Sequence, residues 1–230
     1  MDLLKALDVL STAPLKTESE ADRQGKLKAL RTIDEQLSSP ALRSTADFPR
    51  LLAFSLHSLL RLLGDSDMNV WSLAEEVLHK VVKSLIRTHH DWIIVELYKG
   101  LKGQRFAGRS QRVSLALLGH VIGWTSRSRL KKLTAAIPKL IGQLISTAQQ
   151  DSLLIEALAL HFEPIMRHVA PYITGTQVLT LVDHCVLALI DSQGAVRRSG
   201  AGLITTLCRY WPSPALFYHV FGTLRQLLRV

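Results

Sequence analysis

Cysteine is scarce in this chain, and so are glycine and proline. The 230 residues include 2 cysteines, 13 glycines and 8 prolines. Such low glycine and proline contents, together with 47% hydrophobic residues, argue against a disordered protein. Cys185 and Cys208 lie on the apolar faces of two predicted neighbouring helices. We therefore expect free, buried thiols and neither a disulfide nor a metal pair.

The sequence also lacks long apolar runs. No stretch approaches the roughly 18 residues that a membrane-spanning helix needs. We expect no signal peptide at the N-terminus, because Asp2 and Asp8 interrupt its apolar residues. We expect a protein of the cytoplasm, with the nucleus as a second location.

Acidic residues are missing between Glu96 and Asp151, although ten lysines and arginines occur there. The net charge of +9 is therefore unevenly placed, and residues 1–47 hold seven basic against eight acidic residues. An acid-free span suits nucleic-acid phosphates, anionic lipid heads or an acidic protein helix. A merely solvated face is the alternative. The candidate partner-binding residues are Arg105, Arg109, Arg112, Arg127, Arg129, Lys131 and Lys132. They fall in two turns on opposite sides of one predicted helix, which predicts two patches.

A helical pattern occurs twice in the chain. In Asp191–Arg209 the apolar line starts at Val196, and in the segment DSDMNVWSLAEEVLHKV the same spacing starts at Val70. The two starts are 196 − 70 = 126 positions apart, which is three times 42. A repeat of about that length with two helices per unit is typical of an α-solenoid. Gly200, Ala201 and Gly202 are expected to let neighbouring helices approach closely.

The spacing predicts an all-α organisation in three parts. Residues 1–47 form an amino-terminal helical leader, residues 48–211 form four helix pairs, and residues 212–230 begin an incomplete fifth pair. Second helices are expected to start at 70, 110, 154 and 196. Pro138 is expected to kink a helix over Arg129–Ile145. Because the last helix has no return helix, we expect further repeats of a longer chain to cover it.

Several segments carry a family resemblance. In order along the chain they are SDMNVWSLAEEVLHKVVKSL, ELYKGLK, GRSQRVSLAL, AAIPKLI and AVRRSGAGLITTLC. From about Leu60 to Cys208 they resemble the amino-terminal HEAT-repeat domain of the huntingtin family, and MDLLKALDVL resembles that family's amino-terminal helix. The chain departs from the vertebrate pattern because no glutamine tract or proline-rich segment follows that helix.

The resemblance implies a large cytoplasmic scaffold for vesicle and axonal transport and for autophagy. Its implied partners are further HEAT repeats of the full-length chain, the forty-kilodalton huntingtin-associated protein and transport adaptors. The family brings no catalytic residues, so we expect no enzyme, cofactor or metal.

A HEAT-like DNA-binding protein or alkylpurine DNA glycosylase is the alternative. Such enzymes combine tryptophans with a carboxylate, and Trp71 with Glu75 and Trp92 with Glu96 are spaced as pairs on a helix. We favour a reading in which each tryptophan fills a repeat junction and each glutamate is solvated. Nucleic acid is therefore not expected among the partners.

Three weaker patterns have structural interpretations. GQRFAGRS, ending at Ser110, resembles a phosphate-binding loop but lacks its lysine and its strand, so we read it as a turn. The spacing of the histidines along the predicted helices does not allow them to bind one metal ion together. The leader's stripe of Leu3, Leu4, Leu7 and Leu10 suits a weak contact with an anionic membrane, but packing on the first repeat is the preferred reading.

Overall fold

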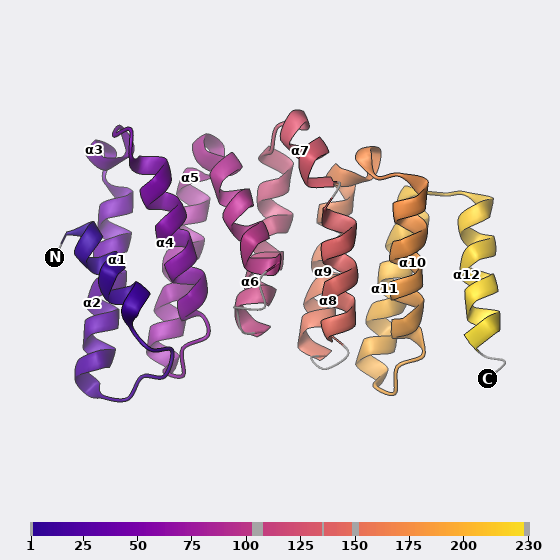
Figure 1. Cartoon of the computed structure of the whole chain (residues 1–230), viewed down its shortest axis with the longest axis horizontal. Coiled ribbons are helices and arrows are strands. Elements are labelled where there is room, and N and C mark those ends of the chain that lie inside the picture. The colour runs from indigo at the N-terminus through magenta and orange to yellow at the C-terminus, as the bar shows by residue number, and fades with distance from the viewer. Residues whose placement is uncertain (1, 103–107, 135, 149–151, 228–230) are drawn as a thin grey trace. The chain divides into compact units, whose positions relative to one another are not determined.

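The computed structural model describes residues 2–102, 108–134, 136–148 and 152–227, and it is helical throughout (Figure 1). Within these ranges there are twelve α-helices, two short 3-10 helices and no strand. None of the helices in the described part is long and apolar enough to cross a membrane. The fold is an all-α HEAT-repeat solenoid, and the chain forms two compact units, Met1–Trp124 and Thr125–Val230.

The first unit is built from stacked antiparallel helices. They are α1 (Leu3–Thr12), α2 (Glu20–Ser38), the short α3 (Pro40–Arg43), α4 (Phe48–Leu62), α5 (Met68–Lys102), α6 (Gly108–Val121) and a 3-10 turn, Ile122–Trp124. The α1–α2 pair lies against the α4–α5 pair, because α1 contacts α4 and α2 contacts α5. The leader of the sequence thus packs in the manner of a repeat.

The apolar line that starts at Val70 faces this core. Val70, Ala74 and Leu78 are completely buried, and Val77 and Val81 are almost so. Asp67 caps the helix, since its carboxylate accepts hydrogen bonds from the backbone N–H groups of Asn69 at 2.8 Å and Val70 at 3.2 Å.

Helix α5 is longer than the sequence pattern predicts. Four helix pairs need a separate helix between the second helices that start at 70 and 110, and the sequence pattern places it over Asp91–Leu101. In the structure this segment continues directly from the Val70 helix. The break is confined to His89, whose backbone is non-helical with φ −127° and ψ 21°. No glycine or proline marks this position, so the sequence offers no stop signal there.

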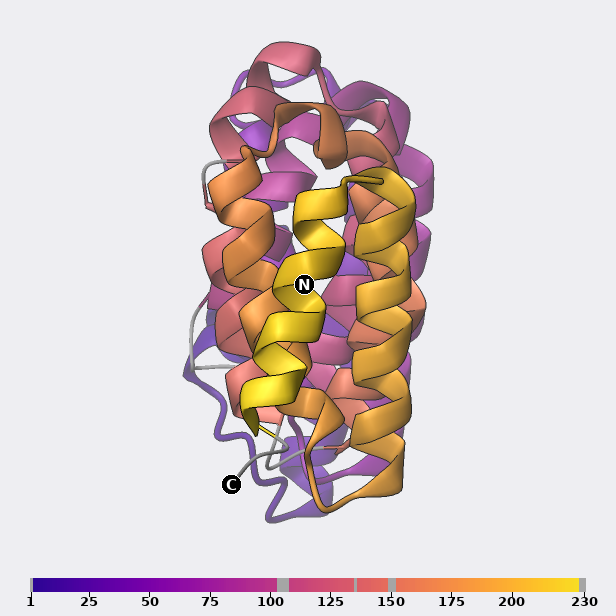
Figure 2. The same cartoon turned by 90° about the vertical axis from the view of Figure 1, so that its right-hand side faces the viewer.

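The second unit has two helical layers. Helices α8 (Ile137–Ala148), α10 (Gly175–Leu189) and α12 (Pro214–Leu227) form one layer, and α9 (Ser152–Val169) and α11 (Gly194–Tyr210) form the other. The short α7 (Arg127–Thr134) and the 3-10 turn Ala170–Tyr172 complete it. Figure 2 looks directly onto α12, with α10 and α11 behind it.

Pro138 does not kink a long helix, which corrects the sequence-based prediction. Arg127–Thr134 and Ile137–Ala148 are separate helices, and Pro138 is the second residue of the later one. In the first turn a proline removes no intrahelical hydrogen bond, so it starts this helix instead of bending it. The proline inside a helix is Pro164, in α9.

The Asp191–Arg209 stretch forms a turn and most of α11. A Cβ atom on Gly200 would lie 2.9 Å from the Cβ of Ala188, whereas one on Gly202 would meet nothing within 4 Å. The close helix approach therefore rests on Gly200 alone, since Ala201 and Gly202 are exposed. The Asp191 carboxylate accepts a hydrogen bond from the N–H of Gln193 at 2.8 Å. Gln193 is the N-cap residue of α11, so Asp191 lies two positions before the cap.

The two thiols differ in their surroundings. Both are free, as predicted, but only Cys185 is fully buried and Cys208 is half-buried. Burial raises the pKa of the Cys185 thiol and, to a smaller degree, that of Cys208.

Candidate partner-binding surface

Helix α7 presents the clearest cationic surface of the predicted set. Leu130 is its buried anchor, 6% exposed, and the helix contacts α9 and the turn Ala170–Tyr172. The backbone N–H of Leu130 donates to the carbonyl of Ser126 at 2.9 Å, which opens the helix. Because Leu130 faces inward, long polar side chains on the opposite face of the helix reach solvent.

Three α7 cations are exposed, namely Arg127, Lys131 and Lys132. Among the described residues, the side chains of these three form no hydrogen bond and no ion pair. Lys131 and Lys132 lie in the last turn, where the negative end of the helix dipole favours cations. Arg129 is half-buried and has an interaction of its own. We refer to Arg127, Lys131 and Lys132 as the α7 patch.

Arg109 is occupied by its own unit. Its guanidinium lies 3.5 Å from the ring centre of Trp71, and its Nη1 donates to the carbonyl of Leu63 at 3.4 Å. Such cation–π stacking fixes both side chains. Arg109 thus holds α6 against α5.

The other predicted cations near Arg109 add little exposed charge. Arg112, on α6, is half-buried and has an interaction partner. Arg105 lies outside the described residues. Arg109 and Arg112 belong to the first compact unit, and the four cations from Arg127 to Lys132 belong to the second.

The Trp92 and Glu96 pair differs from its predicted role, whereas Trp71 lies at the contact between α5 and α6. Arg109 covers one face of the Trp71 ring, so that face is not available to a stacking base. Trp92 does not fill a junction, since it is 48% exposed. Glu96 is not solvated either, because it is 7% exposed and accepts a hydrogen bond from Lys99 at 2.6 Å. Trp92 and Glu96 are four residues apart on the same helix. Glu96 is nevertheless buried, because it lies beside the core residues Ile93 and Leu97.

Arg197 stabilises the turn before α11. Arg197 donates from Nη1 to the carbonyls of Asp191 at 2.8 Å and Ser192 at 2.7 Å. It therefore closes its own turn, as expected for a residue of the repeat.

Ser110, the last residue of the loop-like motif, is buried and donates to the carbonyl of Leu60 at 2.7 Å. The earlier part of that motif, residues 103–107, lies outside the described residues.

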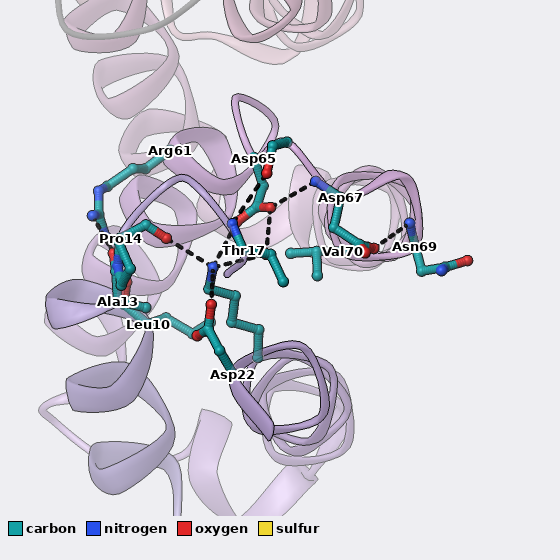
Figure 3. A network of polar contacts seen from close by, with 12 residues as sticks. Leu10, Ala13, Pro14, Thr17, Asp22, Arg61, Asp65, Asp67, Asn69 and Val70 are labelled. Carbon is teal, nitrogen blue, oxygen red and sulfur yellow. Dashed lines mark hydrogen bonds and ion pairs between the residues drawn. The ribbon is translucent and has the colours of Figure 1, made fainter. Parts of the chain in front are cut away.

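A buried network around Lys26 was missed by sequence reasoning (Figure 3). The Lys26 side chain is 0% exposed, and its ammonium donates to the Asp65 carboxylate at 2.9 Å, the Thr17 hydroxyl at 2.9 Å and the Pro14 carbonyl at 2.7 Å. Asp22 is a second ion-pair partner at 3.0 Å. Asp65 also accepts from the N–H of Asp67 at 2.9 Å. The one available signal was that Lys26 falls in the apolar register of α2, four residues before Leu30.

Metal ligands do not gather in the described part of the chain. Within it, no group of three histidine, cysteine or acidic residues lies close enough to hold an ion.

His89 is half-buried at the α5 kink, with its ring edge-on to Phe48 at 4.9 Å between centres. Burial lowers the pKa of His89, and the nearby charges of Arg43 and His90 lower it further.

Known proteins match this helical repeat chain. A family model described as "Huntingtin, N-terminal HEAT 1" matches residues 59–212, which is more than half of the sequence. The chain belongs to the huntingtin family. The matched region includes all seven predicted cations, whereas α1, α2 and α12 lie outside it.

Two curated huntingtin relatives match most of the chain. The HD protein homolog of Dictyostelium discoideum is 26% identical over 320 aligned positions, which cover 93% of this chain and 10% of the relative. Huntingtin of Takifugu rubripes is 26% identical over 205 positions, covering 87% of this chain and 6% of the relative. The chain therefore spans about a tenth or less of the length of these relatives.

Proposed function

We propose that the chain is a non-enzymatic HEAT-repeat scaffold that binds other proteins through its α7 patch. The observation that carries the proposal is that three exposed cations of α7 have no partner within the described structure. Cations that already pair with carboxylates attract an acidic partner only weakly. Unpaired cations attract an acidic partner and fix the register in which the partner binds.

The resemblance to huntingtin supports a more specific setting. In this proposal the scaffold acts in the cytoplasm, with a nuclear pool, and links vesicle and axonal transport to autophagy. Its partners are the forty-kilodalton huntingtin-associated protein and transport adaptors. No described feature favours the DNA glycosylase alternative, since Arg109 covers one face of the Trp71 ring and Glu96 is paired with Lys99.

The outer face of α12 supports a second part of the proposal, namely that further HEAT repeats of a longer chain bind there. Phe217, Tyr218 and Phe221 are 47%, 79% and 68% exposed, and α12 contacts α10 on its other side. Large exposed aromatic clusters mark contact surfaces. The relatives are many times longer than this chain, which agrees with a continuing stack.

A pull-down with purified partner tests the α7 patch. The bait is this 230-residue chain, beside a longer form, and the prey is the forty-kilodalton huntingtin-associated protein. The variant Arg127→Glu/Lys131→Glu/Lys132→Glu should reduce capture at least about fivefold, and the loss should shrink at high salt.

The matched control is Lys16→Glu/Lys28→Glu/Lys83→Glu. It changes the net charge equally at three exposed lysines of the first unit. If the control weakens capture as much as the α7 variant, net charge explains the binding and the α7 patch has no special role. Capture by the longer form alone would assign the partner to the additional repeats.

A further inference from the structure

An apolar groove runs between α1 and α4 in the first unit. Its volume is about 490 Å³, and it is lined by Leu4, Leu7, Asp8, Ser11, Asp47, Arg50, Leu51 and Phe54. Two of these side chains are large, apolar and turned to solvent, because Leu4 is 68% and Phe54 is 50% exposed. The sequence-based stripe assigned Leu4 to the buried face, but of its four leucines only Leu3, Leu7 and Leu10 are buried.

The apolar side chains of the groove follow helical spacing on both walls. Leu4 and Leu7 are three residues apart on α1, and Leu51 and Phe54 are three residues apart on α4. Residues at that spacing share one face of a helix. Two helices that each offer such a pair form the kind of groove in which a third, amphipathic helix can lie.

The charges at this groove are left uncompensated. Asp8, Asp47 and Arg50 are exposed, and within the described residues their side chains form no hydrogen bond or ion pair. Asp47 is especially informative, because it is the N-cap residue of α4 and yet its carboxylate accepts no capping hydrogen bond. Two carboxylates against one guanidinium give the groove a net negative charge, on a chain whose net charge is +9.

We propose that this groove binds an amphipathic α-helix of another protein. The apolar face of that helix packs on Leu4 and Phe54, and its flanking lysines or arginines pair with Asp8 and Asp47. The inference rests on the proposed scaffold function, but it names a different surface and the opposite partner charge from the α7 patch. An acidic helix fits the α7 patch, and a basic helix fits the groove.

Two designed helical peptides test the proposal by fluorescence anisotropy. They share one leucine stripe, and their flanking positions are lysine in one and glutamate in the other. At low salt the lysine peptide should bind at least about fivefold more tightly than the glutamate peptide. No binding of the lysine peptide at about 100 μM, or equal binding of the two, would overturn the proposal.

Charge-swap variants assign the binding to the groove. Asp8→Lys/Asp47→Lys should reverse the preference, so that the glutamate peptide binds more tightly. Glu18→Lys/Glu76→Lys changes the net charge equally at exposed positions outside the groove, and it should keep the original preference. A reversal in both variants would mean that the groove does not select the peptide.

Apolar variants supply a second, independent readout. Leu4→Ser/Phe54→Ser should lower affinity for the lysine peptide about tenfold, because both side chains would contact the bound helix. Val9→Ser/Met68→Ser removes two exposed apolar side chains that do not line the groove, and it should leave the affinity unchanged. Circular dichroism of each variant confirms that the fold persists.

Anionic vesicles provide the remaining arm of the experiment. Vesicle binding that Leu4→Ser/Phe54→Ser abolishes, in the absence of peptide binding, would assign this face to a lipid surface and overturn the proposal. The scaffold function itself is judged separately, because Arg127→Glu/Lys131→Glu/Lys132→Glu changes only the α7 patch. A failure of the groove with a functioning α7 patch removes this inference alone.

Discussion

At the scale of single residues, Lys26 has the most consequential environment in the described chain. Its ammonium has no solvent contact and four polar partners, which come from the loop after α1, from α2 and from the turn before α5. Arg61 reinforces the same junction by donating to the carbonyls of Leu10 at 2.6 Å and Ala13 at 2.5 Å. These carbonyls at the C-terminal end of α1 have no helical partner of their own.

Replacing Lys26 with methionine should destabilise the first unit strongly. The substitution leaves the Asp65 carboxylate buried without its ammonium partner, which costs about 3–5 kcal/mol. Urea denaturation followed by circular dichroism measures this loss. Lys28→Met, at an exposed position of the same helix, should change the free energy of unfolding by less than about 0.5 kcal/mol. Equal effects of the two substitutions would contradict the assigned role of the network.

Two glycines of α11 should respond to alanine with opposite signs. A Cβ on Gly200 would lie 2.9 Å from Ala188 Cβ and 3.2 Å from the carbonyl oxygen of Cys185, so Gly200→Ala should cost about 1–3 kcal/mol. Gly202 has open space around it, so Gly202→Ala should stabilise the helix by up to about 1 kcal/mol. Thermal unfolding of the two variants side by side checks both signs. A stabilising Gly200→Ala would show that α10 and α11 can separate freely.

The stability of the first unit should fall as His89 becomes protonated. Its pKa in the folded state is lowered, so between that value and the unfolded pKa of about 6.5 the unfolded chain binds more protons. Neutral His89 therefore contributes to the free energy of unfolding above about pH 6.5, and this contribution is lost as the pH falls below that value. His89→Phe, which keeps a ring against Phe48, should have a smaller loss of stability between about pH 7.5 and pH 5.5 than the wild type. Urea denaturation at the two pH values measures the difference, and equal losses would contradict it.

At the scale of the element, α1 combines buried and exposed leucines. Leu4 and Leu7 both line the groove, but Leu7 is 2% exposed and belongs to the core, whereas Leu4 is 68% exposed. Leu7→Ser should therefore lower the free energy of unfolding by about 2–5 kcal/mol, and Leu4→Ser by much less than that. Thermal unfolding checks this pair. Similar losses for the two substitutions would indicate that α1 lies differently on its neighbours.

The helices themselves were largely predictable, because burial imposes a helical period on the sequence. The apolar line that starts at Val70 is buried as expected. The line that starts at Val196 continues through Gly200, Leu203, Ile204 and Leu207, and of these only Ile204 is half-buried. The helix ends were less predictable. The His89 break has no local sequence signal, and Pro138 suits either a kink or a first turn, so neighbouring helices decide which one forms.

At the scale of the whole molecule, side-chain pairing across distant segments escaped prediction. Arg109 and Trp71 are 38 positions apart, and Lys26 and Asp65 are 39 apart, so no short-range pattern joins them. The acid-free span was visible in the sequence, but the structure divides it into packed arginines and exposed ones. Charge counting locates a basic region, and only the fold says which cations remain free.

The outer face of α12 should bind a hydrophobic dye in the isolated chain. Three exposed aromatic side chains lie on this helix, and serine at Phe217 and Phe221 removes most of that apolar surface. Phe217→Ser/Phe221→Ser should therefore lower the fluorescence of bound anilinonaphthalene sulfonate while thermal stability changes little. Unchanged fluorescence in this variant would place the dye elsewhere, and Leu153→Ser/Leu160→Ser is the control at two exposed leucines of α9.

The Lys26 network also bears on how the sequence can diverge. A change at Lys26 alone leaves the Asp65 carboxylate buried without its ion-pair partner, and a change at Asp65 alone leaves the buried Lys26 ammonium with Asp22 as its one remaining acidic partner, so either single step is penalised. Positions 26 and 65 should consequently be inherited together or replaced together among relatives. The Lys26–Asp65 pair joins α2 to the turn before α5. A relative that lacks both residues should therefore have different contacts between α2 and that turn.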